Sequence, residues 1–176
     1  DHYKVANAIM DCRTEAMGGT IVRCDECGKT TRVFHSCRNR HCPQCQAAAR
    51  GEWVEQRKAE LLDVPYLHMV FTVPTEIKLI ALYNKEPFYD LMFKAVSETL
   101  LKLGADPHYL GGTIGIIAVM HSWTQQLCFH PHIHCIVPAG ALMPDGVEWK
   151  NGRKDFLFPV NVVKALFRGK FLALLK

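Results

Sequence analysis

Residues 130–137 read HPHIHCIV, an apolar run that begins with three histidines. Side chains alternate along a β-strand, so His132 and His134 project from one face while Ile133 packs into the other. Two imidazoles on one strand face form a chelate for a divalent cation. The stretch therefore predicts a central strand that carries a metal site. Histidines that only fill the surface or the core are the alternative.

Eight cysteines, most of them in the first third of the chain, form a second group of metal donors. The turns Cys24-x-x-Cys27 and Cys42-x-x-Cys45 each hold two sulfurs at a spacing that suits tetrahedral zinc, and their separation is typical of a zinc ribbon. We therefore predict a structural zinc ion bound by these four residues. Core cysteines or a redox pair are the alternatives.

Three further donors leave the number of zinc ions at one or two. Cys37 and His41 stand one helical turn apart, and Cys12 lies nearer the N-terminus. With one more histidine, such as His35 or His2, these residues complete a second zinc site. Alternatively, Cys37 and His41 belong to the first site in place of one of its cysteines.

Charge is distributed unevenly along a chain whose formal net charge is only +4. Residues 29–58 hold seven basic and two acidic side chains, a local excess of five positive charges. Such a run is either a solvated helix face or a surface that binds phosphates. For the second case we expect the DNA contacts to come from Arg38, Arg40, Arg50 and Arg57.

Membrane insertion and export are not predicted. The chain lacks the roughly 18 to 20 uncharged apolar residues of a membrane span, and its first residues lack the pattern of a signal peptide. We therefore expect a cytoplasmic protein with reduced thiols and no membrane partner. The sequence starts without methionine and ends inside an expected helix, so we also expect a fragment of a longer protein.

Periodicity and turn residues predict an α+β protein of two domains, with a boundary near Val64. Residues 1–63 form the zinc-binding domain, and residues 64–176 form the second domain. In the first we expect a helix at 2–12, a hairpin at 20–36 and a helix at 44–62. In the second we expect strands at 66–73, 113–120 and 132–137, an edge strand at 156–158, and helices at 76–83, 87–103 and 161–175.

The histidine strand and its surroundings resemble a known family. His-hydrophobic-His is the metal signature of the HUH nucleases. Residues 120–142 resemble the two-tyrosine rolling-circle transposases of bacterial insertion sequences. Five further segments resemble that family in the same order, so nearly the whole chain is covered: residues 12–14, 18–19, 24–28, 36–46 and 64–74.

This resemblance implies a zinc-binding transposase domain followed by an HUH nuclease domain, an antiparallel sheet flanked by helices. It implies that Mg²⁺ or Mn²⁺, held by His132, His134 and a third polar ligand, polarises a phosphate of single-stranded DNA at the transposon ends. A tyrosine then attacks, which gives a 5′-phosphotyrosine and a free 3′-OH. The protein is then a DNA transposase that works at the bacterial nucleoid.

The third metal ligand is open among three residues. We favour Gln125, whose amide oxygen reaches the metal from the preceding strand. His121, on the same face if that strand is regular, is the alternative, and His130 is a further candidate. We expect Trp123 to pack beneath the metal strand.

Two features depart from the family. Thr20 stands where many relatives have a histidine after the Gly-Gly pair, which affects the second zinc site. The family's catalytic tyrosines lie on a helix well downstream of the histidine strand, whereas all five tyrosines here precede it. We therefore expect a C-terminally incomplete nuclease domain with no nucleophile, which binds metal and single-stranded DNA without forming a covalent adduct.

Two other functions compete with this interpretation. One is a zinc-ribbon module that binds nucleic acid without catalysis, in which the histidines are structural. The other is a metal-dependent hydrolase that uses a bound water, which needs a general base near the metal. The nearest downstream acids are Asp145 and Glu148, so the hydrolase ranks last.

Overall fold

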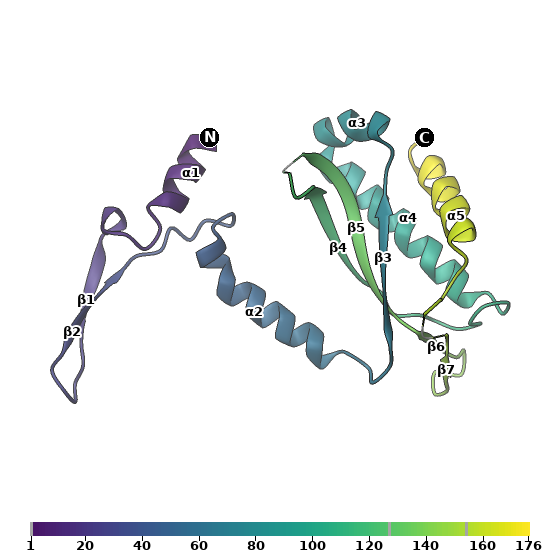
Figure 1. The fold of residues 1–176 in the computed structure, drawn as a ribbon, viewed down its shortest axis with the longest axis horizontal. Coiled ribbons are helices and arrows are strands. Elements are labelled where there is room, and N and C mark those ends of the chain that lie inside the picture. Colours follow the sequence, from purple (N-terminus) through teal and green to yellow (C-terminus); the bar gives the residue numbers. More distant parts are fainter. Residues whose placement is uncertain (1, 127, 154) are drawn as a thin grey trace. The chain divides into compact units, whose positions relative to one another are not determined.

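The computed structural model describes residues 2–126, 128–153 and 155–176 (Figure 1). Contacts between Cα atoms divide the chain into two compact units, Asp1–Leu61 and Leu62–Lys176. Among the described residues, no helix combines the length and the apolar character needed to cross a bilayer.

The N-terminal unit consists of short elements around a hairpin. Strands β1 and β2 pair antiparallel, from Gly19 opposite Phe34 to Arg23 opposite Thr30. The turn between them needs Gly28, whose φ of +70° is strained for any other residue. The elements are α1 (His2–Met10), η1 (Glu15–Met17), β1 (Gly19–Arg23), β2 (Thr30–Phe34) and α2 (Pro43–Ala59). The expected hairpin and helices are therefore present, with somewhat different ends.

Almost nothing apolar is buried in this unit. Across its described residues only Cys12 and Cys42 are buried, with 3% and 1% of their surface exposed. Units of this size without a hydrophobic core require another source of stability, such as a bound metal ion. The two buried side chains are themselves metal donors, which points to the thiols as the centre of the unit.

The C-terminal unit is built on a three-stranded antiparallel sheet in the order β3-β5-β4. Strand β5, the expected histidine strand, lies in the middle. Val70 of β3 stands opposite His134, and His121 of β4 stands opposite His132. The bounds are β3 (Tyr66–Thr72), β4 (Ile117–Trp123) and β5 (Phe129–Pro138). Strand β4 thus begins later than the predicted 113–120.

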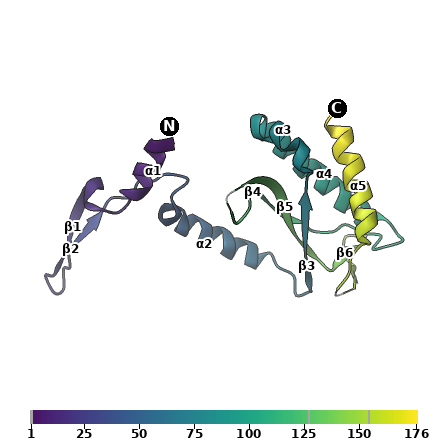
Figure 2. The ribbon, with the colours of Figure 1, turned by 45° about the horizontal axis from the view of Figure 1, so that its top comes forward.

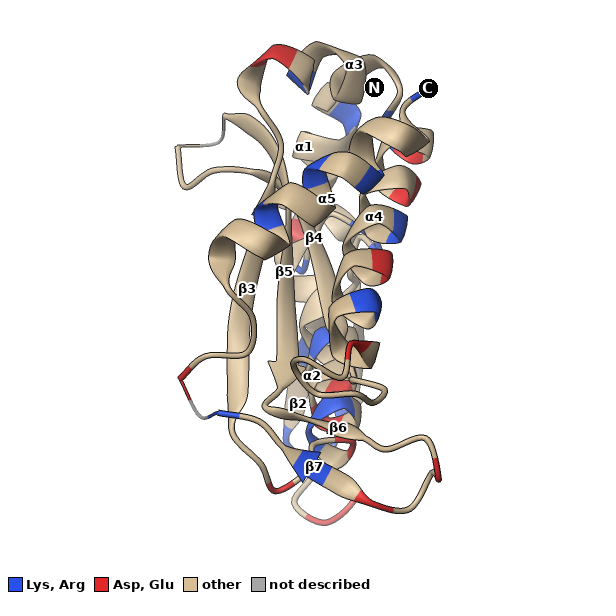
Figure 3. Cartoon of the chain, turned by 90° about the vertical axis from the view of Figure 1, so that its right-hand side faces the viewer, with Lys and Arg blue, Asp and Glu red and all other residues tan. Residues whose placement is uncertain are grey.

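Helices cover one face of this sheet. Helices α4 (Lys85–Ala105) and α5 (Val160–Leu174) lie together on one side of β3, β4 and β5 (Figures 2 and 3). Phe71 and Ile133 point into the core on this side, and the Phe71 ring meets Phe167 of α5 at 5.1 Å between centroids. The remaining elements are η2 (Thr75–Ile77), α3 (Lys78–Tyr83), β6 (Gly140–Leu142) and β7 (Trp149–Asn151). The mixed α and antiparallel β architecture is confirmed.

The predicted edge strand at 156–158 is wrong. Leu157 and Phe158 are both buried, and two consecutive buried residues do not fit the alternation of an edge strand. Instead, β6 and β7 form a separate small antiparallel pair, from Gly140 opposite Asn151 to Leu142 opposite Trp149.

Candidate metal centres

Four thiols converge in the N-terminal unit. The Sγ atoms of Cys12, Cys37, Cys42 and Cys45 all lie within 4.8 Å of one another. Cys12–Cys45 and Cys37–Cys45 are separated by 3.5 Å and 3.6 Å between sulfurs. Tetrahedral zinc with Zn–S bonds of about 2.3 Å spaces its sulfurs by about 3.8 Å. The four thiols therefore fit a structural zinc ion.

The contacts among these thiols shift the pKa values of Cys45 and Cys12 in opposite directions. Partial burial acts to raise the pKa of Cys45, but hydrogen bonds from the thiols of Cys12 and Cys37 lower it to about 7. A backbone hydrogen bond from Cys37 acts to lower the pKa of Cys12, whereas burial and the neighbouring thiols raise it to about 12. Binding of a metal ion to the four sulfurs requires that their protons are released.

The structure groups the thiols differently from the two Cys-x-x-Cys turns. Cys24 and Cys27 are exposed beside the hairpin turn, where backbone hydrogen bonds from Cys27 and Glu26 lower the pKa of Cys24. His41 is exposed, and its ring accepts a hydrogen bond from Arg40. In the part of the chain that the structure describes, none of these three donors joins a group of three or more.

A second group of donors lies on the face of the sheet opposite α4 and α5. Ring nitrogens of His121, His132 and His134 lie within 4.8 Å of one another. Antiparallel pairing places His121 directly across from His132, and their ring centroids are 5.4 Å apart. The rings of His121 and His134 are 4.6 Å apart. The alternation of side chains along β5 and the register between β4 and β5 together bring the three imidazoles close to one another.

In His132 and His134 the Nδ1 atom takes part in a hydrogen bond, which leaves Nε2 of each ring free. Nδ1 of His132 lies 2.6 Å from the carbonyl oxygen of His130, so it must be the donor. Nδ1 of His134 lies 2.7 Å from Nε2 of His68. Burial first, and then the neighbouring histidines, lower the pKa of His134 and so favour its neutral form. Both rings can therefore present a bare Nε2 to a cation.

The other candidates for a third ligand, Gln125 and His130, are not part of this group of three, although the ring of His130 lies 5.4 Å from that of His132 between centroids. Gln125 is exposed in the turn that follows β4, beyond an irregular pairing between His121 and Trp123. His130 contributes its carbonyl group to the orientation of His132. Sequence reasoning did not single out His68. The alternation of side chains along β3 could have placed it on the sheet face that carries His121, His132 and His134, which we call the histidine face.

The histidine face carries no Asp, Glu, Lys or Arg from the three strands, which appear tan in Figure 3. Its remaining surface is partly apolar. Val70 and Trp123 are 47% and 61% exposed. The expectation that Trp123 packs beneath the metal strand is therefore wrong, because most of its side chain is exposed.

No tyrosine contacts these imidazoles in the described residues. The hydroxyl of Tyr66 accepts a hydrogen bond from the backbone of Leu62, and the ring of Tyr109 packs on Phe158. The aromatic ring contacts recorded for His121, His132 and His134 are with one another and with two further histidines, His68 and His130.

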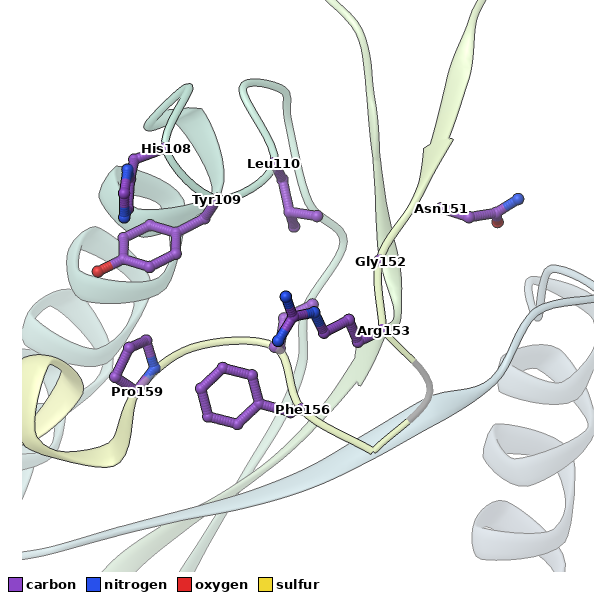
Figure 4. Close-up of a pocket in the computed structure, with 9 residues that line it drawn as sticks. His108, Tyr109, Leu110, Asn151, Gly152, Arg153, Phe156 and Pro159 are labelled. Atoms are coloured by element: carbon purple, nitrogen blue, oxygen red, sulfur yellow. The ribbon is translucent and has the colours of Figure 1, made fainter.

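A separate hollow of about 460 Å³ lies beside the loop after α4 and the segment after β7 (Figure 4). Arg153 reaches into it between Leu110 and Phe156, and Tyr109 lines one side. His108 is its only imidazole. The hollow thus lacks the donor set of a metal centre, and the histidine face remains the candidate site of chemistry.

Comparisons with known proteins assign both units to the same class. Residues 1–73 match the family model described as "Transposase zinc-binding domain", and residues 115–176 match the one described as "Putative transposase". The "Putative transposase y4qJ" of Sinorhizobium fredii (strain NBRC 101917 / NGR234) is 50% identical over 169 residues, which are 96% of this chain and 42% of that protein.

A second relative is the "Transposase for insertion sequence element IS801" of Pseudomonas savastanoi pv. phaseolicola. It is 30% identical over 145 residues, which are 81% of this chain and 34% of that protein. The chain therefore spans less than half the length of these two relatives.

Two solved structures are similar in fold to this chain. The metal-bound complex of the conjugative relaxase TrwC with oriT DNA has a TM-score of 0.50 and 18% identity, over 62% of this chain and 42% of that one. TrwC with a 27-mer DNA has a TM-score of 0.50 and 19% identity, over 62% and 44%.

Together these findings show that the chain is similar to transposases that carry a zinc-binding domain, and that its fold resembles that of the TrwC relaxase. The resemblance to the HUH-class transposases of bacterial insertion sequences is thereby confirmed in both parts of the chain.

Proposed function

We propose that this chain is the zinc-binding and nuclease portion of a rolling-circle transposase that nicks and transfers single-stranded DNA at transposon ends. The observation that carries the proposal is the convergence of His121, His132 and His134 on the open face of the sheet. These three histidines would hold a divalent cation, which would neutralise charge on a phosphoryl oxygen. A tyrosine of the transposase attacks the phosphorus, the bond from phosphorus to the 3′-oxygen breaks, and the products are a 5′-phosphotyrosine and a free 3′-OH.

The donor set favours Mn²⁺ over Mg²⁺ at this site. All three donors are imidazoles, and the strands that carry the site contain no carboxylate. Mg²⁺ prefers oxygen ligands, whereas imidazole suits the transition metals better. Oxygen atoms of a DNA phosphate complete the coordination, which makes the substrate itself part of the site.

For structural zinc we propose Cys12, Cys37, Cys42 and Cys45 as the ligands. Their sulfurs are close enough to share one ion, and two of them are the buried residues of the unit. Cys24 and Cys27, with or without His41, are left as donors for a second zinc ion. Zinc holds the fold of the domain, and the chemistry belongs to the histidines.

Single-stranded DNA fits the surfaces around both centres. Trp123, two residues after His121 at the end of β4, offers an exposed ring on which a base can stack. In the zinc-binding unit, Arg38, Arg40 and Arg50 are exposed cations that can contact phosphates. A DNA substrate of this kind places the protein at the nucleoid in the bacterial cytoplasm.

The proposal is tested by Mn²⁺ binding to the zinc-loaded chain, followed by electron paramagnetic resonance, and by Mn²⁺-dependent nicking in a protein of the relatives' full length. We expect one Mn²⁺ per chain, and His132→Ala should abolish both binding and nicking. His108→Ala in the separate hollow is the matched control. Equal Mn²⁺ binding by the wild type and His132→Ala would favour a nucleic-acid-binding module without catalysis.

A further inference from the structure

His68 lies on the edge strand β3, diagonally across from His134. The register pairs Val70 with His134 and His68 with Ile136, so the two histidines are two residues out of direct opposition on the same face. Their rings are nearly parallel, at an interplanar angle of 9°, with centroids 5.0 Å apart. Nε2 of His68 lies 2.7 Å from Nδ1 of His134.

This position makes His68 a neighbour of the donor group. The three imidazoles that lie within 4.8 Å of one another are those of His121, His132 and His134, without His68. Its ring contacts Nδ1 of His134, whereas no hydrogen-bond partner is recorded among the described residues for Nε2 of His134. Resting on the proposed function, we infer that His68 is the positioning residue that holds His134 in its metal-binding tautomer.

When both rings are neutral, a single hydrogen lies between Nε2 of His68 and Nδ1 of His134. If His134 carries it on Nδ1, its Nε2 keeps a free lone pair and can bind a cation. If His68 donates from Nε2 instead, His134 carries its proton on Nε2 and cannot bind a cation. A metal-binding His134 thus requires His68 to accept with Nε2 and to keep its own proton on Nδ1.

The two strand-β5 ligands are oriented by different means. His132 donates Nδ1–H to the backbone carbonyl of His130, which no side-chain substitution removes. His134 relies on a side chain, because His68 is the one hydrogen-bond partner recorded for its ring within the described ranges. Of these two ligands, only His134 can therefore lose its orienting partner through substitution of a single residue that is not itself a ligand.

A neutral acceptor also matters for the substrate. A carboxylate in this place would cancel part of the ion's charge, whereas an imidazole leaves the full charge for the phosphate. The strands β3, β4 and β5 contain no Asp, Glu, Lys or Arg. His68 thus orients a ligand without weakening the attraction between the cation and an anionic DNA backbone.

The test compares His68→Ala with His68→Gln, whose amide oxygen can accept a hydrogen bond near the place of Nε2. Long-range ¹H–¹⁵N correlation spectra report the tautomer of His134 in the zinc-loaded, Mn²⁺-free chain, and paramagnetic resonance reports Mn²⁺ affinity. We expect the Nδ1–H tautomer in the wild type and in His68→Gln. In His68→Ala we expect the Nε2–H form and Mn²⁺ binding weaker by about 10-fold or more.

His132→Ala separates failure of this inference from failure of the proposed function. If His132→Ala loses Mn²⁺ while His68→Ala binds it like the wild type, with an unchanged His134 tautomer, the inference about His68 is overturned alone. If His132→Ala binds Mn²⁺ normally, the proposed function fails, and the His134 tautomer in His68→Ala still decides whether His68 sets it.

Discussion

The sulfurs of Cys12 and Cys45 lie 3.5 Å apart, although 33 residues separate them in the sequence. Cys12 follows α1, and Cys45 lies in the first turn of α2. This contact, with those of Cys37 and Cys42, closes a unit that buries almost nothing else. Whatever holds the four thiols together thus holds the unit together.

Removing a cluster thiol should therefore cost more than removing a hairpin thiol. We expect Cys12→Ser to lose the cluster zinc and the cooperative unfolding of residues 1–61, because binding of structural zinc contributes on the order of 10 kcal/mol to folding. Cys24→Ser should keep the cluster zinc and the fold. Zinc per chain by mass spectrometry, with thermal unfolding, measures both. Equal zinc loss in the two variants would contradict the grouping of the thiols.

The third ligand of the histidine centre can be decided by two substitutions. We propose His121, which stands across from His132, ahead of Gln125 in the following turn. His121→Ala should weaken Mn²⁺ binding by about 10-fold or more, whereas Gln125→Ala should change it by less than about 3-fold. Titration followed by paramagnetic resonance gives both affinities. The reverse order would assign the site to the amide of Gln125.

Two arginines of α2 should differ in their effect on DNA binding. Arg57 pairs with Glu60 and lies over the ring of Trp53, with its Cζ 5.7 Å from the ring centroid. Arg50 is exposed, and no ion pair is recorded for it among the described residues. Arg50→Ala should weaken binding to single-stranded DNA and reduce the slope of log affinity against log salt by about 0.7.

Arg57→Ala is the matched comparison, because it removes the same charge from the same helix. We expect a smaller change in affinity and in salt slope, measured by fluorescence anisotropy of a labelled oligonucleotide. Equal slopes for the two variants would show that both arginines, or neither, contact phosphates.

Acid should weaken the contact between α4 and α5. A hydrogen bond from Lys170 lowers the pKa of Glu98 against a smaller effect of burial, at 2.7 Å between Nζ and Oε2. A lowered pKa means that the pair stabilises the fold while Glu98 is ionised, and that this stabilisation is lost as the pH falls through the folded pKa. Lys170→Met should therefore be less stable than the wild type at neutral pH, with a difference that shrinks in acid.

Urea unfolding of the C-terminal unit at a series of pH values measures this difference. Glu98→Gln serves as the control, because it removes the titrating group and should show the same convergence with the wild type in acid. A difference between Lys170→Met and the wild type that stays constant with pH would contradict the role of the ion pair.

Much of the C-terminal unit follows from local pattern. The alternation in residues 130–137 places His132 and His134 together and Ile133 in the core, where it is fully buried. Helix α4 begins near Pro87 and ends near Gly104, as turn and capping residues predict. The prediction of an edge strand at 156–158 failed because the burial of Leu157 and Phe158 in the core outweighed the preference of these residues for a strand.

The sequence by itself determined that the chain carries two sets of metal donors, and which face of β5 holds the imidazoles, because side-chain alternation is a local property of a strand. Only the tertiary structure decided which donors share a site. Cys12 reaches Cys45 by closing a long loop, and His121 and His68 reach the other histidines through the register of three strands. Register and loop closure depend on contacts between distant segments, and no local period of the sequence records them.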